Sequence, residues 1–384
     1  MNFKKEILKT FERKKHKIVW QPRIYYWFYG NGLKNRLPEG YNDITVLYGM
    51  YWNIPYYGGD IPEKYVNKSM LEIYDDLNAS PRYPEEVLGV RLFRLKLDTD
   101  NVKCITKLEN EKIITKYKTP KGTLREVRKR GYHLEYPVKS IEDIKIARYI
   151  LKNLEFEFDK DAFEIAKREF GNRGVIQSYY PRSPFQRLLI DYMGFENTIY
   201  ALNDHPNEIE GFMDAIDEWD DEMYKVILKS PLKILNFGEN IDGNIDSPTI
   251  FERYLIPYYK KRIKQIHHKG KFCHIHMDGS LKPILPYLKE LEFDGIEAAT
   301  PLPQGDVSLE ELKEALGDKI LLDGIPAILF LPEHSEEELK DFATKVLELF
   351  SPNLILGISD ELPPPAEIER VNLVSKIVDD YNNG

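Results

Sequence analysis

The chain has 384 residues, of which 42% are hydrophobic and 30% charged, and its net charge is −9. This composition is typical of a globular protein with a large core, without an apolar run near the ~20 residues of a membrane-spanning helix and without a uniformly basic surface for nucleic acid. Two cysteines, Cys104 and Cys273, are too few for a disulfide framework. We therefore expect a cytoplasmic protein that binds neither membranes nor nucleic acid.

The N-terminal part of the chain predicts an extension followed by a first strand. Residues 1–16 are rich in Lys, Glu and Phe and predict an exposed amphipathic helix, and residues 17–20 predict a β-strand. The aromatic segment 24–29 is followed by Gly30 and Gly32. We expect this segment to form a lid or the wall of a pocket.

Residues 90–138 have a different character. Alternating stretches at 90–97, 102–108 and 112–117 are separated by turn residues, which is the pattern of antiparallel hairpins. We interpret the region as a β-rich insertion in an early βα loop, where barrels accept additions that face the active site.

From about residue 170, short β-branched runs alternate with helical patterns, as in parallel βα units. These units predict an α/β fold, a (β/α)8 TIM barrel, with 1–384 as a single domain that carries the N-terminal extension and the β-hairpin insertion. The active site of such a barrel lies at the C-terminal ends of its strands. The predicted strands are 174–179, 233–237, 271–276, 295–298, 319–322 and 354–358.

Several helix boundaries are visible in the sequence. Ser308 and Ser335 are each followed three residues later by Glu, so both positions predict capping boxes. Residues 140–154 carry an apolar stripe at helical spacing. Pro257 is expected to kink or interrupt a helix that begins near Ser247.

The most informative segment for chemistry is 273–279, at the end of a predicted strand. Because strand side chains alternate, His274, His276 and Asp278 share one face, which in a barrel looks inward toward the mouth of the active site. Imidazole and carboxylate groups both suit a divalent metal. A hydrogen-bonded polar rim is the alternative, and whether His274 is a ligand stays open.

Further carboxylates follow other predicted strands. Asp360 follows the last strand and could be a third ligand, a general base or a residue that shapes the turn. Glu239 also follows a strand and could complete a metal site or act as an acid or base. Asp323 has an equivalent position with a turn role as its alternative, and Asp246 is expected to cap the next helix.

Several short patterns, taken in order, resemble the uroporphyrinogen decarboxylase superfamily, which includes corrinoid-dependent methyltransferases. The resemblance is strongest from Asn236 to the C-terminus, weaker over 119–177 and poor before that. It implies a (β/α)8 barrel. The patterns are Phe237-Gly238-Glu239, Ser247-Pro248, Pro257-Tyr258, His276-Met277-Asp278-Gly279, Gly305-Asp306, Leu316-Gly317-Asp318-Lys319 and Ser359-Asp360.

The resemblance also implies a metal site. In methyltransferases that move methyl from a corrinoid to coenzyme M, zinc is held by a His-x-Cys motif and a later cysteine. His276 falls on that histidine, Asp278 on its cysteine partner and Asp360 on the later cysteine. With Glu239 as a fourth ligand, zinc is the first expectation, although the harder carboxylates also suit other divalent metals. Glu239 and Asp360 are the catalytic candidates.

The function implied is metal-dependent transfer of a methyl group between a small substrate and a corrinoid on a separate carrier protein. The expected substrate-binding residues are Arg23, Tyr25, Trp27 and Asn236, because an aromatic wall suits a corrinoid ring or an aromatic methyl ether. The decarboxylase is the alternative, but its polyanionic substrate meets an arginine-rich segment, whereas Arg23 is the one arginine of 21–27. A non-catalytic barrel that binds a ligand is the other alternative.

Overall fold

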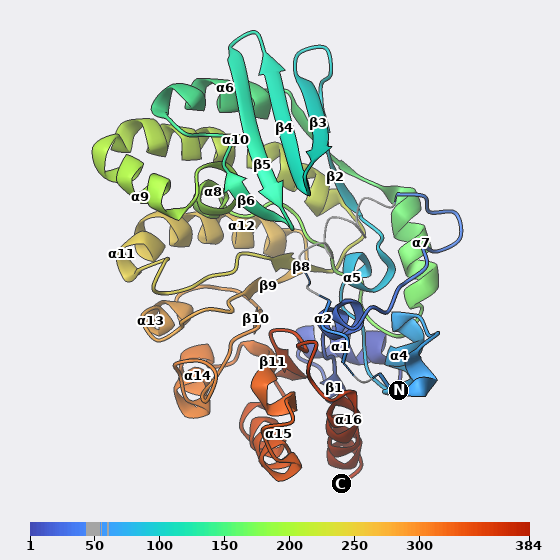
Figure 1. Cartoon of the computed structure of the whole chain (residues 1–384). Coiled ribbons are helices and arrows are strands. Elements are labelled where there is room, and N and C mark those ends of the chain that lie inside the picture. The colour runs from blue at the N-terminus through green and yellow to red at the C-terminus, as the bar shows by residue number, and fades with distance from the viewer. Residues whose placement is uncertain (44–53, 55, 60) are drawn as a thin grey trace.

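Six parallel strands form the centre of the molecule (Figure 1). The structure is a computed structural model that describes residues 1–43, 54, 56–59 and 61–384. Neighbouring strands follow the order β1-β12-β11-β10-β9-β8, and every pairing is parallel. The bounds are β1 Val19–Trp20, β8 Ile234–Phe237, β9 Phe272–His276, β10 Gly295–Glu297, β11 Ile320–Pro326 and β12 Leu354–Ser359.

This sheet confirms six of the seven strands predicted outside the 90–138 region. Every residue of β8, β10, β11 and β12 is buried, as expected when both faces of a parallel sheet are covered. The first strand of the chain, β1, pairs with the last, β12. The sheet therefore brings the two ends of the sequence together.

The seventh predicted strand, 174–179, is wrong. From this segment, the amide of Gln177 donates to the Arg82 carbonyl oxygen at 3.4 Å, and near Arg82 the amide of Ser80 donates to the Trp20 carbonyl oxygen at 2.9 Å. These bonds are too few for the regular ladder that defines a strand. Side-chain hydrogen bonds, described below, hold the segment in place.

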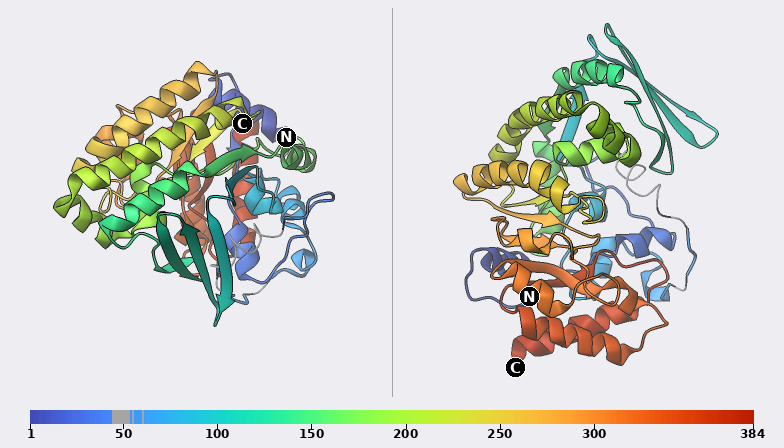
Figure 2. Two further views of the ribbon diagram at one scale, coloured as in Figure 1. Left: turned by 90° about the horizontal axis from the view of Figure 1, so that it is seen from above. Right: turned by 90° about the vertical axis from the view of Figure 1, so that its left-hand side faces the viewer.

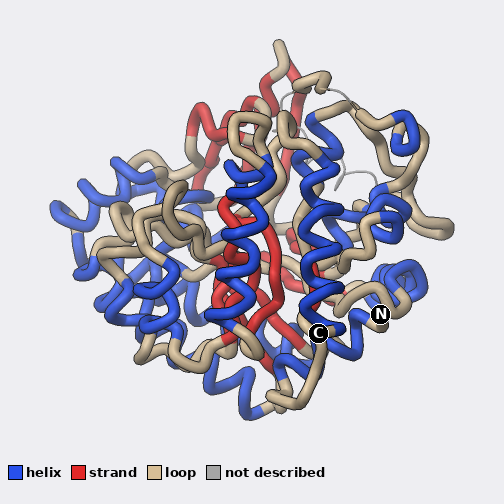
Figure 3. The backbone as a smooth tube through the Cα atoms, turned by 90° about the horizontal axis from the view of Figure 1, so that it is seen from below, coloured by secondary structure: helices blue, strands red, loops and turns tan. Residues whose placement is uncertain are grey.

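Helices surround the central strands (Figures 2 and 3). None of the helices in the described residues combines the length and apolar character that crossing a bilayer demands. The helices are α1 Phe3–Phe11, α2 Tyr25–Gly30, η1 Glu63–Tyr65, α4 Met70–Asp76, α5 Pro84–Leu88, α6 Ile141–Lys152, α7 Lys160–Phe170, α8 Pro184–Arg187, η2 Leu188–Tyr192, α9 Phe195–Asp204, α10 Pro206–Lys229, α11 Pro248–Ile250, η3 Phe251–Leu255, α12 Ile256–His268, α13 Leu285–Leu288, α14 Leu309–Leu316, η4 Ala327–Phe330, α15 Glu336–Phe350 and α16 Ile368–Asn383.

Helix boundaries agree with the local sequence signals. Ser308 and Ser335 begin α14 and α15 with both hydrogen bonds of a capping box, and α6 occupies the stripe predicted at 140–154. The helix expected near Ser247 starts as α11, passes through the π-helical turn η3 and continues as α12. The irregular turn precedes Pro257, the second residue of α12, because proline lacks the N–H that would continue the helical ladder.

The two N-terminal helices are more buried than their sequences indicate. α1 is amphipathic as predicted, but Phe3, Ile7 and Phe11 are buried in a cluster with residues of β1, β11 and β12. The aromatic segment 24–29 forms most of α2, in which Trp27 is buried in the core and Tyr26 is 39% exposed. Only part of this segment can therefore line a pocket.

The β-rich region contains two antiparallel sheets. A four-stranded sheet has the order β3-β4-β5-β6, and its strands are joined as successive hairpins. The strand predicted at 90–97 does not join them, because β2 pairs with β7 instead. The bounds are β2 Phe93–Leu97, β3 Lys103–Glu109, β4 Lys112–Thr119, β5 Gly122–Lys129, β6 Tyr132–Glu135 and β7 Leu154–Phe158.

A glycine after β10 permits close backbone contact near the ends of the strands. A Cβ at Gly305 would lie 1.8 Å from the Thr300 carbonyl oxygen. The next residue, Asp306, accepts hydrogen bonds from the Ser280 hydroxyl at 2.5 Å and the Leu281 amide at 2.9 Å. Gly305 thus lets the loop after β10 hold the loop after β9.

We predict that Gly305→Ala lowers the free energy of unfolding by about 1–3 kcal/mol, the range for forcing extra atoms into a packed site. Gly211→Ala is the matched control, because a Cβ there meets no atom within 4 Å and alanine favours the interior of α10 by about 0.5–1 kcal/mol. Urea unfolding of both variants measures the effects. Equal stability of the two variants would contradict the packing argument.

Candidate active site

The carboxyl ends of β9, β10, β11 and β12 bring polar side chains to one end of the sheet. In the register, Glu297 of β10 pairs with His276 of β9, and Asp323 of β11 follows the partner of Glu297 and pairs with Leu356 of β12. His274, His276, Glu297 and Asp323 are all buried. The alternation expected from the sequence is therefore correct for His274 and His276, which face the interior.

Three residues predicted as metal ligands lie together at this end. The Nε2 atom of His276 lies 3.8 Å from the Asp278 Oδ2 atom and 3.7 Å from the Asp360 Oδ1 atom. Ligand atoms of all three residues lie within 4.8 Å of one another. His276 is 7% exposed, whereas the two aspartates are 29% exposed. The cluster is thus open on its carboxylate side.

The charges of this cluster favour a cation. Burial alone would lower the pKa of His276, but Asp360, Asp278 and Glu297 together hold this pKa well above its usual range. Burial would raise the pKa of Asp278, yet the contact with His276 keeps it below its usual value. The carboxylates outnumber the imidazolium, so a divalent ion bound by the same atoms would satisfy them in place of the proton.

Neighbouring groups hold each ligand in place. Asn240 donates to the Asp278 Oδ2 atom at 3.1 Å, and Arg23 donates to the Asp360 Oδ1 atom at 2.5 Å. The other ring nitrogen of His276, Nδ1, lies 3.7 Å from the Glu297 carboxylate. Outer partners of this kind orient metal ligands. One imidazole and two carboxylates, with one open side, fit a divalent ion such as zinc.

A buried network lies directly beneath the cluster. Arg82 binds Glu297 and Asp323, each at 2.7 Å, and Tyr83 donates to Glu297 at 2.7 Å. His274 Nδ1 lies 3.1 Å from the same carboxylate. Burial raises the pKa of Asp323 to about 6, against the lowering effect of Arg82. His274 therefore belongs to this network, because its Nδ1 faces Glu297 and its Nε2 lies 2.5 Å from Gln177.

Arg23 lies in a second network at the rim. Its guanidinium contacts Glu86, Asp360 and Glu361, each at 2.5 Å, and donates to the Tyr179 hydroxyl at 2.8 Å. Burial and neighbouring carboxylates raise the pKa of Glu361 well above its usual value, although Arg23 lowers it. Arg23, predicted to bind substrate, is thus surrounded by protein carboxylates.

The other predicted site residues are dispersed. Glu239 lies outside the three-residue cluster, where its two oxygens accept hydrogen bonds from the Ser183 amide at 2.9 Å and hydroxyl at 2.6 Å. Asn236 donates to Tyr83 at 2.7 Å in the interior, and Trp27 packs in the core. Tyr25 lies in α2 with its ring 5.5 Å from the Arg23 guanidinium.

The cap predicted at Asp246 is wrong, because Ser247 is the N-cap of α11. The Asp246 carboxylate instead accepts hydrogen bonds from the Gln186 side chain at 2.7 Å and the Asp242 amide at 3.2 Å.

Sequence reasoning missed Arg82 and Glu297, the two central members of the buried network. Glu297 offered a readable signal, because it lies at the end of a predicted strand like the residues that were singled out. Arg82 offered none, since it lies in a loop segment far from any predicted barrel strand. Its role depends on contacts with residues 215 and 241 positions away.

A second group with metal-ligating atoms has another role. His267, Cys273 and Asp294 also lie within reach of one ion, but they surround the N-terminal end of β9. The Asp294 Oδ2 atom accepts the Cys273 amide at 2.8 Å and lies 2.9 Å from His267. The carboxylate thus ties α12 to the N-terminal end of β9, so we assign this group a structural role.

We predict that Arg82→Met lowers the free energy of unfolding by about 3–5 kcal/mol, because it leaves two buried carboxylates without a cation. The control Arg253→Met removes the exposed pair with Glu210 and should cost less than about 1 kcal/mol. Urea unfolding followed by tryptophan fluorescence gives both values. A loss for Arg82→Met no larger than that for Arg253→Met would show that the network does not stabilise the fold.

Comparisons with known proteins identify a family and a similar fold. The model of the family "Uroporphyrinogen decarboxylase (URO-D)" matches residues 122–381. Among solved structures, a methyltransferase from Methanosarcina mazei has a similar fold, with a TM-score of 0.60, 13% identity and coverage of 98% of each chain.

A second solved structure is more distant. It is a B12-independent methionine synthase from Shewanella sp. W3-18-1 in complex with selenomethionine, with a TM-score of 0.46, 12% identity and coverage of 96% of this chain and 97% of the other. A sequence comparison with curated proteins finds no significant match. The model of the uroporphyrinogen decarboxylase family matches more than half of the chain. The protein therefore belongs to the uroporphyrinogen decarboxylase family.

Proposed function

We propose that this protein is a metal-dependent enzyme that transfers a methyl group between a small substrate and a corrinoid supplied by a carrier protein. One observation carries the proposal: His276 and Asp278, which follow each other closely at the end of β9, meet Asp360 from the end of β12 at the carboxyl end of the sheet, with one open side. Family membership supports an enzyme, and the cluster supports metal-assisted chemistry rather than a passive barrel.

The proposed ligand set is the three-residue cluster. His276 would contribute Nε2, and the two aspartates would contribute one carboxylate oxygen each. Glu239 would have to leave both hydrogen bonds with Ser183 to join them, so we place it outside the set. When bound, the ion supplies a Lewis acid that stabilises negative charge on a substrate oxygen or sulfur.

The residues around the cluster have separate roles in this proposal. Arg23 and Asn240 fix the orientation of the two aspartates, so that the cluster is organised before substrate arrives. Tyr26 of α2 is partly exposed and would present its aromatic ring beside the opening. Tyr25 packs edge-on against it at 4.6 Å. These two rings, rather than Trp27, would form the apolar wall beside a methyl group.

We also propose that the sheet closes into a (β/α)8 barrel. The segments around Ser80 and Gln177 would occupy the second and third positions, between β1 and β8. Their backbone bonds near β1 support this order, as do the side-chain bonds from Gln177 to His274 and from Tyr83 to Asn236. The cluster would then lie at the mouth of the barrel, where active sites occur in this fold.

Decarboxylation of uroporphyrinogen is the competing activity, and the family name favours it. A polyanionic substrate requires several available cations. Arg23, which contacts Asp360, and Arg82, which contacts Glu297, are both bound to carboxylates of the protein. Arg182 donates to Asn240 at 3.0 Å, and this single cation does not meet the need of a polyanion. The local charge therefore favours a small substrate in which the group that carries the methyl is neutral or cationic.

We predict that the protein binds about one divalent ion per chain. His276→Ala should lower the affinity for this ion at least about tenfold, because the substitution removes a ligand. His267→Ala is the matched control, because His267 belongs to the second group with metal-ligating atoms. Metal content after dialysis against zinc, measured by mass spectrometry, separates the two sites. The ligand assignment would be refuted if the metal content of His276→Ala were unchanged, or if His267→Ala lost its metal.

We predict methyl transfer with a corrinoid and no loss of carbon dioxide from uroporphyrinogen. The assay mixes the protein with reduced corrinoid protein and a panel of methyl ethers, methylamines and methyl thiols, and records the absorbance of methylated cobalt. Asp360→Asn should lower the rate about a hundredfold or more, because one preorganised charge at the reacting group is lost. Asp380→Asn, on the exposed side of α16, should leave the rate unchanged. Decarboxylation without methylated cobalt would favour the competing activity.

A further inference from the structure

The projecting four-stranded sheet has a charge opposite to that of the rest of the protein. Residues 102–131 contain ten Lys or Arg and three Asp or Glu, a net charge of +7. Because the whole chain has a net charge of −9, the remaining residues carry −16. A basic element of this kind on an acidic protein creates a local positive field.

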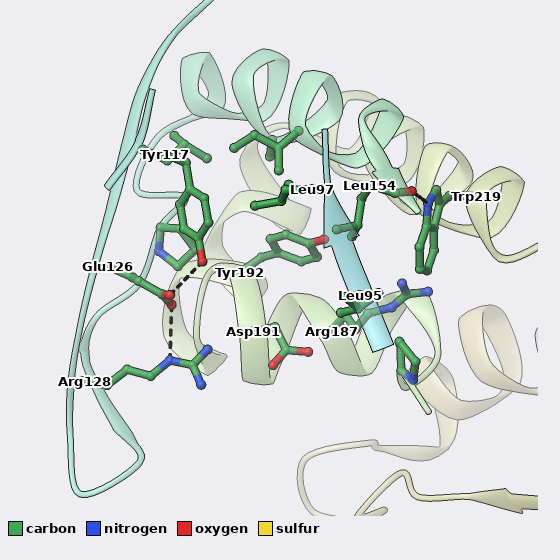
Figure 4. A pocket seen from close by; sticks show the side chains of 15 residues that line it. Leu95, Leu97, Tyr117, Glu126, Arg128, Leu154, Arg187, Asp191, Tyr192 and Trp219 are labelled. Atoms are coloured by element: carbon green, nitrogen blue, oxygen red, sulfur yellow. Dashed lines mark hydrogen bonds and ion pairs between the residues drawn. The ribbon is translucent and has the colours of Figure 1, made fainter. Parts of the chain in front are cut away.

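The two faces of the sheet have different surroundings. Tyr117, Glu126 and Arg128 point from β4 and β5 into a cavity of about 460 Å³ against α6 and α10 (Figure 4). Because strand side chains alternate, the intervening residues point away from the body of the protein. This outer face includes the exposed residues Lys103, Lys107, Lys112, Lys116 and Lys118.

The cavity beneath the sheet is not the candidate active site, since none of its lining residues belongs to the His276 cluster. Its charged side chains are largely paired within the protein, as in the contacts of Arg128 with Glu126 and of Arg187 with Asp220. The outer face differs, because those five lysines make no ion pair among the described residues. The unbalanced charge is therefore on the outside of the sheet.

The strand register places like charges directly opposite one another. Each lysine of β4 faces a cation on a neighbouring strand: Lys118 faces Lys103, Lys116 faces Arg125, and Lys112 faces Lys129. Like charges at directly opposed positions destabilise a sheet. Lys112 also faces Glu109 on its other side, and Arg125 and Lys129 are paired with Glu135 and Glu111, which offsets part of this repulsion. Lys103 and Lys118 have no such partner among the described residues.

Protection of a sheet edge does not explain the pattern. Lysines on an edge strand prevent unwanted pairing with other chains, and this purpose accounts for Lys103 and Lys107 on β3. β4 is an inner strand, paired on both sides, so Lys112, Lys116 and Lys118 protect no edge. Their repulsion is relieved when an acidic surface covers them.

We propose that the outer face of β3, β4 and β5 docks an acidic surface of a partner protein. The unpaired cations are lysines, which are depleted from the cores of stable interfaces, so the complex is transient and steered by charge. No outward-facing position of these three strands is aromatic, whereas single-stranded nucleic acid is held by stacking on aromatic rings. The partner is the corrinoid carrier, which must bind and leave in each turnover; this identification rests on the proposed function.

The test replaces the three inner lysines by Lys112→Gln, Lys116→Gln and Lys118→Gln. The triple variant should fold at least as stably as the unmodified protein, because like-charge repulsion is removed. Its KM for the corrinoid carrier protein should rise about tenfold or more, the lower end of what electrostatic steering changes, with less dependence on salt. Its rate with free cobalamin should not change, since the His276 cluster is intact.

The control carries Lys264→Gln, Lys269→Gln and Lys376→Gln, which remove the same charge from exposed positions on or beside α12 and α16. It should have the carrier KM of the unmodified protein. If the control and the triple variant behave alike, net charge rather than the sheet governs docking, and the proposal is overturned.

Direct titration of the carrier by fluorescence anisotropy separates docking from chemistry. If no methylated cobalt forms but the carrier binds and the triple variant abolishes binding, the proposed function fails while the docking face stands. If the carrier does not bind the unmodified protein, the docking proposal fails. The docking proposal is also overturned if a single-stranded RNA oligonucleotide binds more tightly than the carrier. The same holds if sedimentation shows salt-sensitive self-association that is lost in the triple variant.

Discussion

The guanidinium of Arg82 is the contact on which the interior of the site depends. Glu297 and Asp323 come from neighbouring parallel strands, and both carboxylates are buried. Two buried carboxylates without a cation would carry a large desolvation cost and repel each other. Arg82 contacts both at 2.7 Å, so the protein can keep charged groups where the strands end.

The balance of charge changes from the interior to the opening. Arg82 is shared by two carboxylates in the interior, and Arg23 is shared by three at the rim. Farther out, Asp278 has His276 beside it, Asp360 shares Arg23 with two other carboxylates, and both aspartates are partly exposed. Negative charge is therefore least compensated where a ligand can enter. A divalent cation is the simplest species that restores the balance there.

Short apolar runs predicted the central sheet, because this pattern of buried parallel strands does not depend on distant contacts. The family was predicted from the order of short motifs between Phe237 and Asp360, and the family model confirms it. It also placed His276, Asp278 and Asp360 correctly at strand ends, where the structure brings them together. The segment 174–179 failed as a strand, since side-chain bonds such as that of Gln177 with His274 replace its ladder. Corrinoid and carrier remain predictions.

A position at the end of a strand did not allow the contacts of a side chain to be predicted from the sequence. Glu239 shares that position with His276 and Glu297, yet Ser183 occupies both of its oxygens. Ser183 is 56 residues away in the sequence, and no local pattern indicates such a contact. Arg82 was missed for the same reason, because only the folded chain shows which carboxylates surround it.

X-ray absorption spectroscopy of the zinc-loaded protein tests the central claim most directly, because it reports the atoms bound to the ion. The structure predicts a first shell of one imidazole nitrogen and carboxylate oxygens, at about 2.0–2.2 Å from zinc. Imidazole scattering should disappear in His276→Ala. A shell that contains sulfur at about 2.3 Å would place the ion at Cys273 or Cys104 and would contradict the account.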